Sequence, residues 1–144
     1  MKQSKRLQPV CDFKKRQEQE AAKKLTKASQ ELAQHQQRLL DLDSYRAEYG
    51  QKFATTGGSG MTAQKLREFQ GFMHNLNIAI EQQKAAIEKL RVDQESIKRQ
   101  WLAARNRAKA VDNVQSQYQL REQQEEEKKL QKEQDDRNVR RLSH

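Results

Sequence analysis

The chain has 144 residues, of which 33% are hydrophobic and 34% are charged, and its formal net charge is +9. This composition is too polar for a packed globule of that length but is normal for a two-stranded coiled coil, which has no wide core to enclose an active site. No stretch approaches the roughly 20 apolar residues of a membrane span, and the lone cysteine, Cys11, suits a reducing compartment. We therefore expect a cytoplasmic protein that is not an enzyme.

The first predicted helix covers about residues 3–54 and begins near Pro9, whose fixed backbone angle is tolerated in a first turn. Its sheltered positions recur at alternating intervals of three and four residues, which places them on one face of a helix. Cys11 continues this spacing toward the N-terminus, as a small filler between helices. The series consists of Leu25, Ala28, Leu32, His35, Leu39, Leu42, Arg46, Tyr49 and Phe53.

A glycine-rich loop is predicted over residues 55–61, because three of the five glycines lie between positions 57 and 60. Gly57 or Gly58 is expected to end the first helix in the left-handed conformation that glycine adopts readily. Thr62 or Ser59 can then cap the next helix by accepting a hydrogen bond from a free amide. The loop has neither the lysine nor the flanking strand of a phosphate-binding loop.

The second predicted helix covers about residues 62–140 and keeps the same spacing without a break over more than fifty residues. A seven-residue repeat held this long suits one partner helix. Together with the first series and the loop, it predicts an all-α fold, a long antiparallel two-helix coiled-coil hairpin within a single domain of residues 1–144. The series consists of Leu66, Phe69, Met73, Leu76, Ile80, Gln83, Ile87, Leu90, Gln94, Ile97, Trp101, Ala104, Ala108, Val111, Gln115 and Tyr118.

The pairing register follows from the sum of facing residue numbers, which is constant in an antiparallel pair. The two series allow sums of 115 and 122, and we favour 115 because it turns the chain between Gly57 and Gly58. That register layers Leu39 on Leu76, and Cys11 on Ala104. It also leaves everything after about residue 113 unpaired, as a protruding C-terminal helix that either orders on a partner or frays.

In the register of 115, Lys14 and Glu18 would lie beside Trp101, with the lysine stem over the indole ring. His35 is interpreted as a seam residue and not as a metal ligand, because no second ligand lies one turn away on its face. We expect no metal, cofactor or small-molecule substrate. The cations are dispersed, without a basic run or aromatic stacking platform, so nucleic-acid binding is disfavoured.

An apolar stripe lies near the loop end, where positions that flank a coiled-coil seam normally carry charge. The register pairs Tyr45 with Phe72 at two such positions, and Leu42, Tyr49, Leu76 and Ala79 continue the stripe. Two interpretations stay open: the two rings widen the core, or the stripe is a docking patch for a protein.

The chain resembles the FliJ family of flagellar export proteins over about residues 7–142. The resemblance rests on Leu42-x-x-Tyr45-x-x-x-Tyr49, the glycine loop, Phe69-x-x-Phe72-x-x-x-Leu76-x-x-Ala79-Ile80-Glu81-Gln82, Trp101 and Arg105-x-Arg107-x-Lys109-Ala110. No single motif is specific, but the conjunction of Tyr45, Tyr49, Phe72 and Trp101 at these intervals is distinctive.

This resemblance implies a non-enzymatic stalk protein bound to the hexameric flagellar export ATPase and to the cytoplasmic part of the membrane export gate protein (FlhA type). It also implies binding to export chaperones and a peripheral location at the inner membrane, at the flagellar basal body. The family's gate-binding patch falls on the stripe already described. Arg38 and Gln83 stand where some relatives have glutamine and histidine, which makes them possible rim positions. The patch consists of Leu42, Tyr45, Tyr49, Phe72, Leu76 and Ala79.

Coupling of the ATPase to the gate, in support of export and flagellar assembly, is therefore the expected function. The alternative is a passive structural spacer or adaptor, and a coil that associates with nucleic acid is a weaker third interpretation. The apolar stripe argues against a passive spacer.

Overall fold

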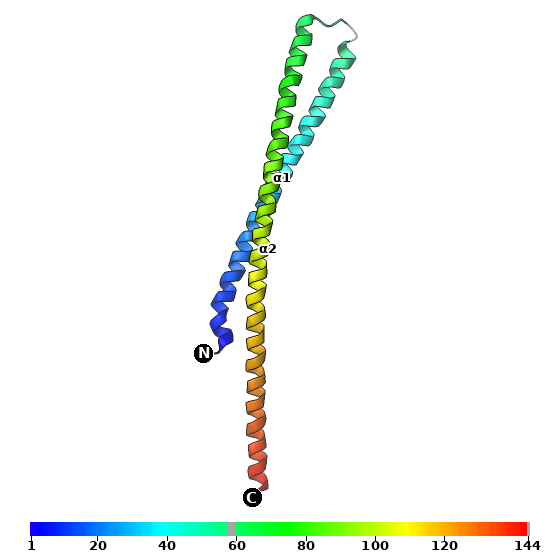
Figure 1. Ribbon diagram of the computed structural model, residues 1–144. Helices are drawn as coiled ribbons and strands as arrows, with labels where there is room; N and C mark the ends of the chain where they lie inside the picture. Colours follow the sequence, from blue (N-terminus) through cyan, green and yellow to red (C-terminus); the bar gives the residue numbers. More distant parts are fainter. Residues whose placement is uncertain (58–59, 144) are drawn as a thin grey trace. The chain divides into compact units, whose positions relative to one another are not determined.

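The computed structural model describes residues 1–57 and 60–143, which form the two long helices α1 (Gln3–Thr56) and α2 (Ala63–Leu142). The helices pack against each other in opposite directions and are joined at one end, as a hairpin (Figure 1). This confirms the predicted all-α hairpin. Each helix ends two residues beyond the predicted limit, at 56 and 142 instead of 54 and 140.

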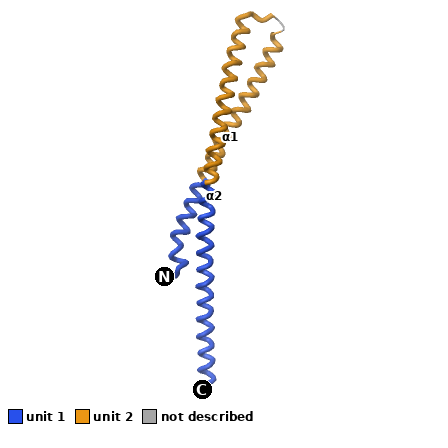
Figure 2. The backbone as a smooth tube through the Cα atoms, in the orientation of Figure 1, with its two compact units in different colours: residues 1–22, 100–144 blue, residues 23–99 orange. Residues whose placement is uncertain are grey.

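The chain divides into two compact units, and a single domain over residues 1–144 stays a prediction. Unit 1 comprises residues 1–22 and 100–144, and unit 2 comprises residues 23–99. Each unit contains a stretch of α1 beside a stretch of α2, and the loop between the helices belongs to unit 2 (Figure 2).

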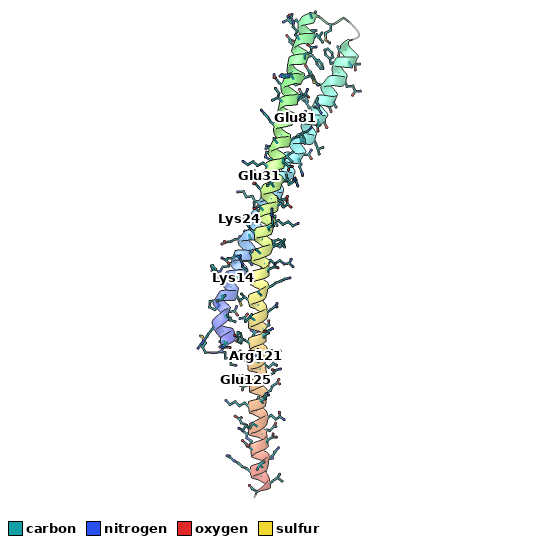
Figure 3. All side chains as sticks on the ribbon, in the orientation of Figure 1. Lys14, Lys24, Glu31, Glu81, Arg121 and Glu125 are labelled. Carbon is teal, nitrogen blue, oxygen red and sulfur yellow. The ribbon has the colours of Figure 1, made fainter. Side chains whose placement is uncertain are left out.

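The predicted seams are the sheltered faces of both helices. Every residue in the two series is buried or half-buried except Leu66, which is 41% exposed. Ile80 is completely buried, and Leu32, Leu76 and Ala108 are nearly so. Charged side chains such as Lys24, Glu31 and Glu81 occupy the exposed faces (Figure 3). The seven-residue period therefore identifies the helix interface correctly.

Pro9 lies in the second turn of α1, because the helix already begins at Gln3. It was expected in the first turn, where the missing N–H costs nothing. In the second turn the carbonyl of Lys5 loses its helical donor. Lys5 and Pro9 are both exposed, so water can solvate that carbonyl.

The connection begins and ends with polar contacts. Thr55 Oγ1 donates to the carbonyl of Gln51 at 2.7 Å, and Lys65 N donates to Thr62 Oγ1 at 3.2 Å, so Thr62 caps α2 as expected. Among the described residues the left-handed glycine is Gly60, with φ of +89°. It was expected at Gly57 or Gly58, but α1 continues through Thr56, and Gly58 lies outside the described residues together with Ser59.

The favoured register is wrong in unit 2. Phe53 stacks on Phe69, a pair whose numbers add up to 122, and the hydrogen bonds of Arg46 with Asn77 and of Ser29 with Gln94 join pairs that add up to 123. These contacts match the alternative sum of 122 and lie too far along the helices for a sum of 115. Ser29 Oγ accepts from Gln94 Nε2 at 2.9 Å, and Asn77 Oδ1 accepts from Arg46 Nη1 at the same distance. The physical reason is the later turn: extension of α1 to Thr56 moves the reversal toward Gly60.

The contacts of unit 1 also differ from the register of 115. The thiol of Cys11 donates to Gln115 Oε1 at 3.4 Å, and so does not layer on Ala104. Gln115 Nε2 in turn donates to the carbonyl of Ser4 at 3.1 Å and to Gln8 Oε1 at 2.7 Å. One glutamine of α2 thus bonds three groups on α1.

Pairing extends beyond residue 113, where the sequence placed its end. Ser4 donates to Glu122 through its hydroxyl at 2.7 Å and through its backbone N–H at 3.1 Å. Residues 123–143 are all exposed, and the side chains in this stretch, including Glu125, project from α2 (Figure 3). The correction follows from the shifted register, which moves the N-terminus of α1 several residues further along α2. That residues 123–142 order on a partner stays a prediction.

The cation at Trp101 comes from α2 itself. Arg105 Cζ lies 5.6 Å from the centre of the Trp101 ring, and Lys14 Nζ lies 5.9 Å from the ring of its neighbour Phe13. The predicted contact of Lys14 with Trp101 was therefore wrong. An arginine one turn away on the same helix stays close to the ring in any register.

Candidate functional site

Five aromatic rings gather at the loop end of unit 2. Positions 45, 49 and 53 share one face of α1 because they are four residues apart, and positions 69 and 72 share one face of α2. Centroid distances are 3.6 Å for Phe53 and Phe69, 5.4 Å for Tyr49 and Phe69, and 4.4 Å for Tyr49 and Phe72. Tyr45 meets Phe72 edge-on at 5.9 Å, as the sequence predicted for this pair.

The six residues of the predicted patch differ in how much surface they present. Tyr45 is 49% exposed, whereas Leu76 is only 8% exposed and contributes from beneath. The other four, Leu42, Tyr49, Phe72 and Ala79, are half-buried. Tyr45 thus has the largest exposed fraction in the patch and the most surface available to a partner. Its ring also packs against that of Phe72.

A shallow hollow of about 540 Å³ adjoins Tyr45 and brings both predicted rim residues to the patch. Its lining consists of Arg38, Asp41, Leu42, Tyr45 and Gln83. Asp41 was not singled out from the sequence, although it precedes Leu42 and follows Arg38 by three residues, the spacing that places two residues on one helix face. Asp41 Oδ1 accepts a hydrogen bond from Gln37 Nε2 at 3.0 Å.

His35 fastens Gln83 to α1 beside this hollow. Gln83 Nε2 lies 2.9 Å from the His35 carbonyl oxygen and 3.0 Å from His35 Nδ1. Both residues are half-buried. The sequence indicated only that each occupies a seam position, because the contact depends on a register that the seven-residue period leaves open.

Arg46 links the two helices of unit 2. Its Nη2 lies 3.2 Å from Asp43 Oδ1, and its Nη1 donates to Asn77 on the facing helix.

Further along α2, Arg91 donates two hydrogen bonds to the Glu88 carboxylate, which lowers the pKa of that carboxyl group. The exposed ion pair contributes little to stability because water screens it.

A second hollow, of about 310 Å³, opens at the loop end of the same unit. The rings of Tyr49, Phe53 and Phe69 contribute apolar lining, and the charged lining residues are Lys52, Lys65 and Glu68. Tyr49 thus belongs both to the aromatic cluster and to the lining of this hollow.

Within residues 1–57 and 60–143, no cluster of histidine, cysteine and carboxylate side chains could hold a metal ion. No helix in the described part of the chain is both long and apolar enough to cross a membrane.

The family model described as "Flagellar FliJ protein" matches residues 3–144. No curated protein and no solved structure matches the chain significantly.

Proposed function

The chain belongs to the FliJ family of flagellar proteins, and from that membership we propose that it couples the flagellar export ATPase to the membrane export gate. The family consists of non-enzymatic coiled-coil proteins of the flagellar export apparatus. The partners we propose are the hexameric export ATPase, the cytoplasmic part of the gate protein (FlhA type) and export chaperones. The proposed location is the cytoplasmic side of the basal body, at the inner membrane.

The observation that carries the proposal is the aromatic surface centred on Tyr45. A half-exposed tyrosine at a position that flanks the seam, packed against Phe72 and beside a hollow, has the form of an interface anchor. Tyrosine is among the residues whose truncation most often weakens protein complexes. We propose that the gate protein docks here.

ATPase binding is proposed for unit 1. The helical stretch 123–142 is exposed throughout and carries acidic and basic groups three or four residues apart, a spacing that allows local pairs along a helix. Ordering of this stretch on the ATPase ring would supply contacts to it. No single residue of this contact is proposed.

The test compares Tyr45→Ala with Phe13→Ala in binding to the purified cytoplasmic domain of the gate protein. Phe13 is a matched control, since it is 51% exposed against 49% for Tyr45 and lies in the other unit. We expect Tyr45→Ala to weaken gate binding by about 2 kcal/mol, roughly thirtyfold, with helix content unchanged. We expect Phe13→Ala to bind as the unaltered chain does.

Two outcomes would contradict the docking patch. If Tyr45→Ala binds the gate domain as tightly as the unaltered chain does, Tyr45 is not an anchor of the interface. A large fall in melting temperature, comparable with that of the seam variant Leu39→Ala, would instead indicate that Tyr45 and Phe72 widen the core, as expected of a passive spacer.

A further inference from the structure

The orientation of the Gln83 amide is determined by its neighbour on α1. A carbonyl oxygen can only accept a hydrogen bond, so the Gln83 atom that lies 2.9 Å from the His35 carbonyl must be the NH2 nitrogen. The same nitrogen lies 3.0 Å from His35 Nδ1. Gln83 Oε1 is therefore directed away from both His35 acceptors.

The contact also determines the tautomer of His35. Because the Gln83 nitrogen supplies the protons, His35 Nδ1 must present its lone pair, and the ring proton resides on Nε2. Reversing the amide would set Gln83 Oε1 against the His35 carbonyl, two acceptors facing each other. The backbone carbonyl and the ring nitrogen thus favour one amide orientation.

Gln83 Oε1 is an unused acceptor on a residue that lines the hollow. Among the described residues, no hydrogen bond is formed to this oxygen, while Gln83 itself lines the hollow with Leu42 and Tyr45. Asp41 adds carboxylate oxygens to the same rim. Arg38 also lines the hollow and can only donate hydrogen bonds. The apolar side chains of Leu42 and Tyr45 and the Gln83 acceptor together suit an apolar side chain that carries an N–H donor beside it.

We propose that His35 is a positioning residue for gate recognition: it holds Gln83 so that Oε1 accepts a hydrogen bond from an N–H of the gate protein, beside an apolar side chain that enters the hollow. This inference rests on the proposed docking of the gate at Tyr45. A mobile glutamine side chain loses rotamer entropy when a partner binds. A glutamine that is already hydrogen-bonded to α1 has lost that entropy before the partner binds. The hydrogen bond from Gln83 to His35 therefore increases the affinity for the partner.

The experiment compares His35→Leu with His35→Asn in the full chain. Leucine removes the ring acceptor but suits a coiled-coil seam, so we expect an equal or higher melting temperature. We expect its affinity for the purified gate cytoplasmic domain, measured by calorimetry, to fall about two- to tenfold, the value of one hydrogen bond. Asparagine places Oδ1 near the position of His35 Nδ1, and we expect it to restore most of the affinity.

A second measurement needs no partner. In the free chain, nuclear magnetic resonance should show the Gln83 side-chain NH2 protons protected from exchange, and this protection should decrease in His35→Leu and persist in His35→Asn. The positioning role is overturned if His35→Leu binds the gate domain as tightly as the unaltered chain. Equal loss of affinity in His35→Leu and His35→Asn would overturn it too.

The Tyr45→Ala variant separates this inference from the function on which it rests. If Tyr45→Ala weakens binding and His35→Leu does not, gate docking stands and the positioning role of His35 fails. If Tyr45→Ala binds unchanged, the docking site itself is wrong, and the role of His35 falls with it.

Discussion

Two isoleucines on α2 provide a direct test of which helix face is the core. Ile80 is completely buried, whereas Ile78, two residues earlier, is 44% exposed. Residues two apart on a helix point about 200° away from each other. The variants Ile80→Ala and Ile78→Ala therefore make the same chemical change on opposite faces of the same turn.

The expected cost of Ile80→Ala follows from its complete burial. The substitution removes three carbon atoms, and about 0.8 kcal/mol for each gives roughly 2.4 kcal/mol of lost transfer free energy. An incompletely closed cavity raises the loss of unfolding free energy to about 3 kcal/mol, within the usual range for large-to-small core changes. Ile78 keeps nearly half of its surface in water, which halves the transfer loss, and the better helix propensity of alanine offsets part of the rest. We expect about 1 kcal/mol or less for Ile78→Ala.

The assay is urea unfolding of the full chain, followed by far-ultraviolet circular dichroism. The dependence of unfolding free energy on urea should stay the same in both variants, so that the midpoint reports stability. The reasoning is refuted if the two variants differ by less than about 0.5 kcal/mol, because the face of α2 that carries Ile80 would then not be its packing face.

Two further predictions concern register and the thiol. In a Cys11-free chain, cysteines at Leu39 and Gln83 should form a disulfide within one molecule faster than cysteines at Leu39 and Leu76, and the reverse order would support the sum of 115. Burial, followed by the nearby carboxylates of Asp112 and Asp12, raises the pKa of the Cys11 thiol, so at about pH 8 less of it is thiolate and thiol reagents should react slowly. Raising the pH should speed the reaction, and Asp112→Asn should speed it at constant pH by lowering the pKa; an unchanged rate in Asp112→Asn would argue against the role of that carboxylate.

The candidate site was only partly predictable from sequence. Tyr45 and Phe72 were predicted to pair, and their rings do meet, because aromatic side chains are long enough to touch across a moderate change in register. Asp41 and the bonds from Gln83 to His35 were missed. A hydrogen bond forms only when the distance between donor and acceptor is correct to within a few tenths of an ångström. The periodicity of a sequence carries no information at that scale.

The sequence by itself determined which residues are helical, which face of each helix is sheltered and that the helices run antiparallel. These properties depend on the local spacing of apolar residues and on the glycines between the two series, so the sequence of one protein is enough to predict them. The register was decided by the tertiary structure. Sliding one helix by a whole seven-residue repeat leaves the apolar pattern unchanged, and so the pattern cannot distinguish a sum of 115 from one of 122. The choice depends on where the chain turns and on polar pairs such as Gln94 with Ser29 and Glu122 with Ser4, which form only when residues far apart in the chain meet.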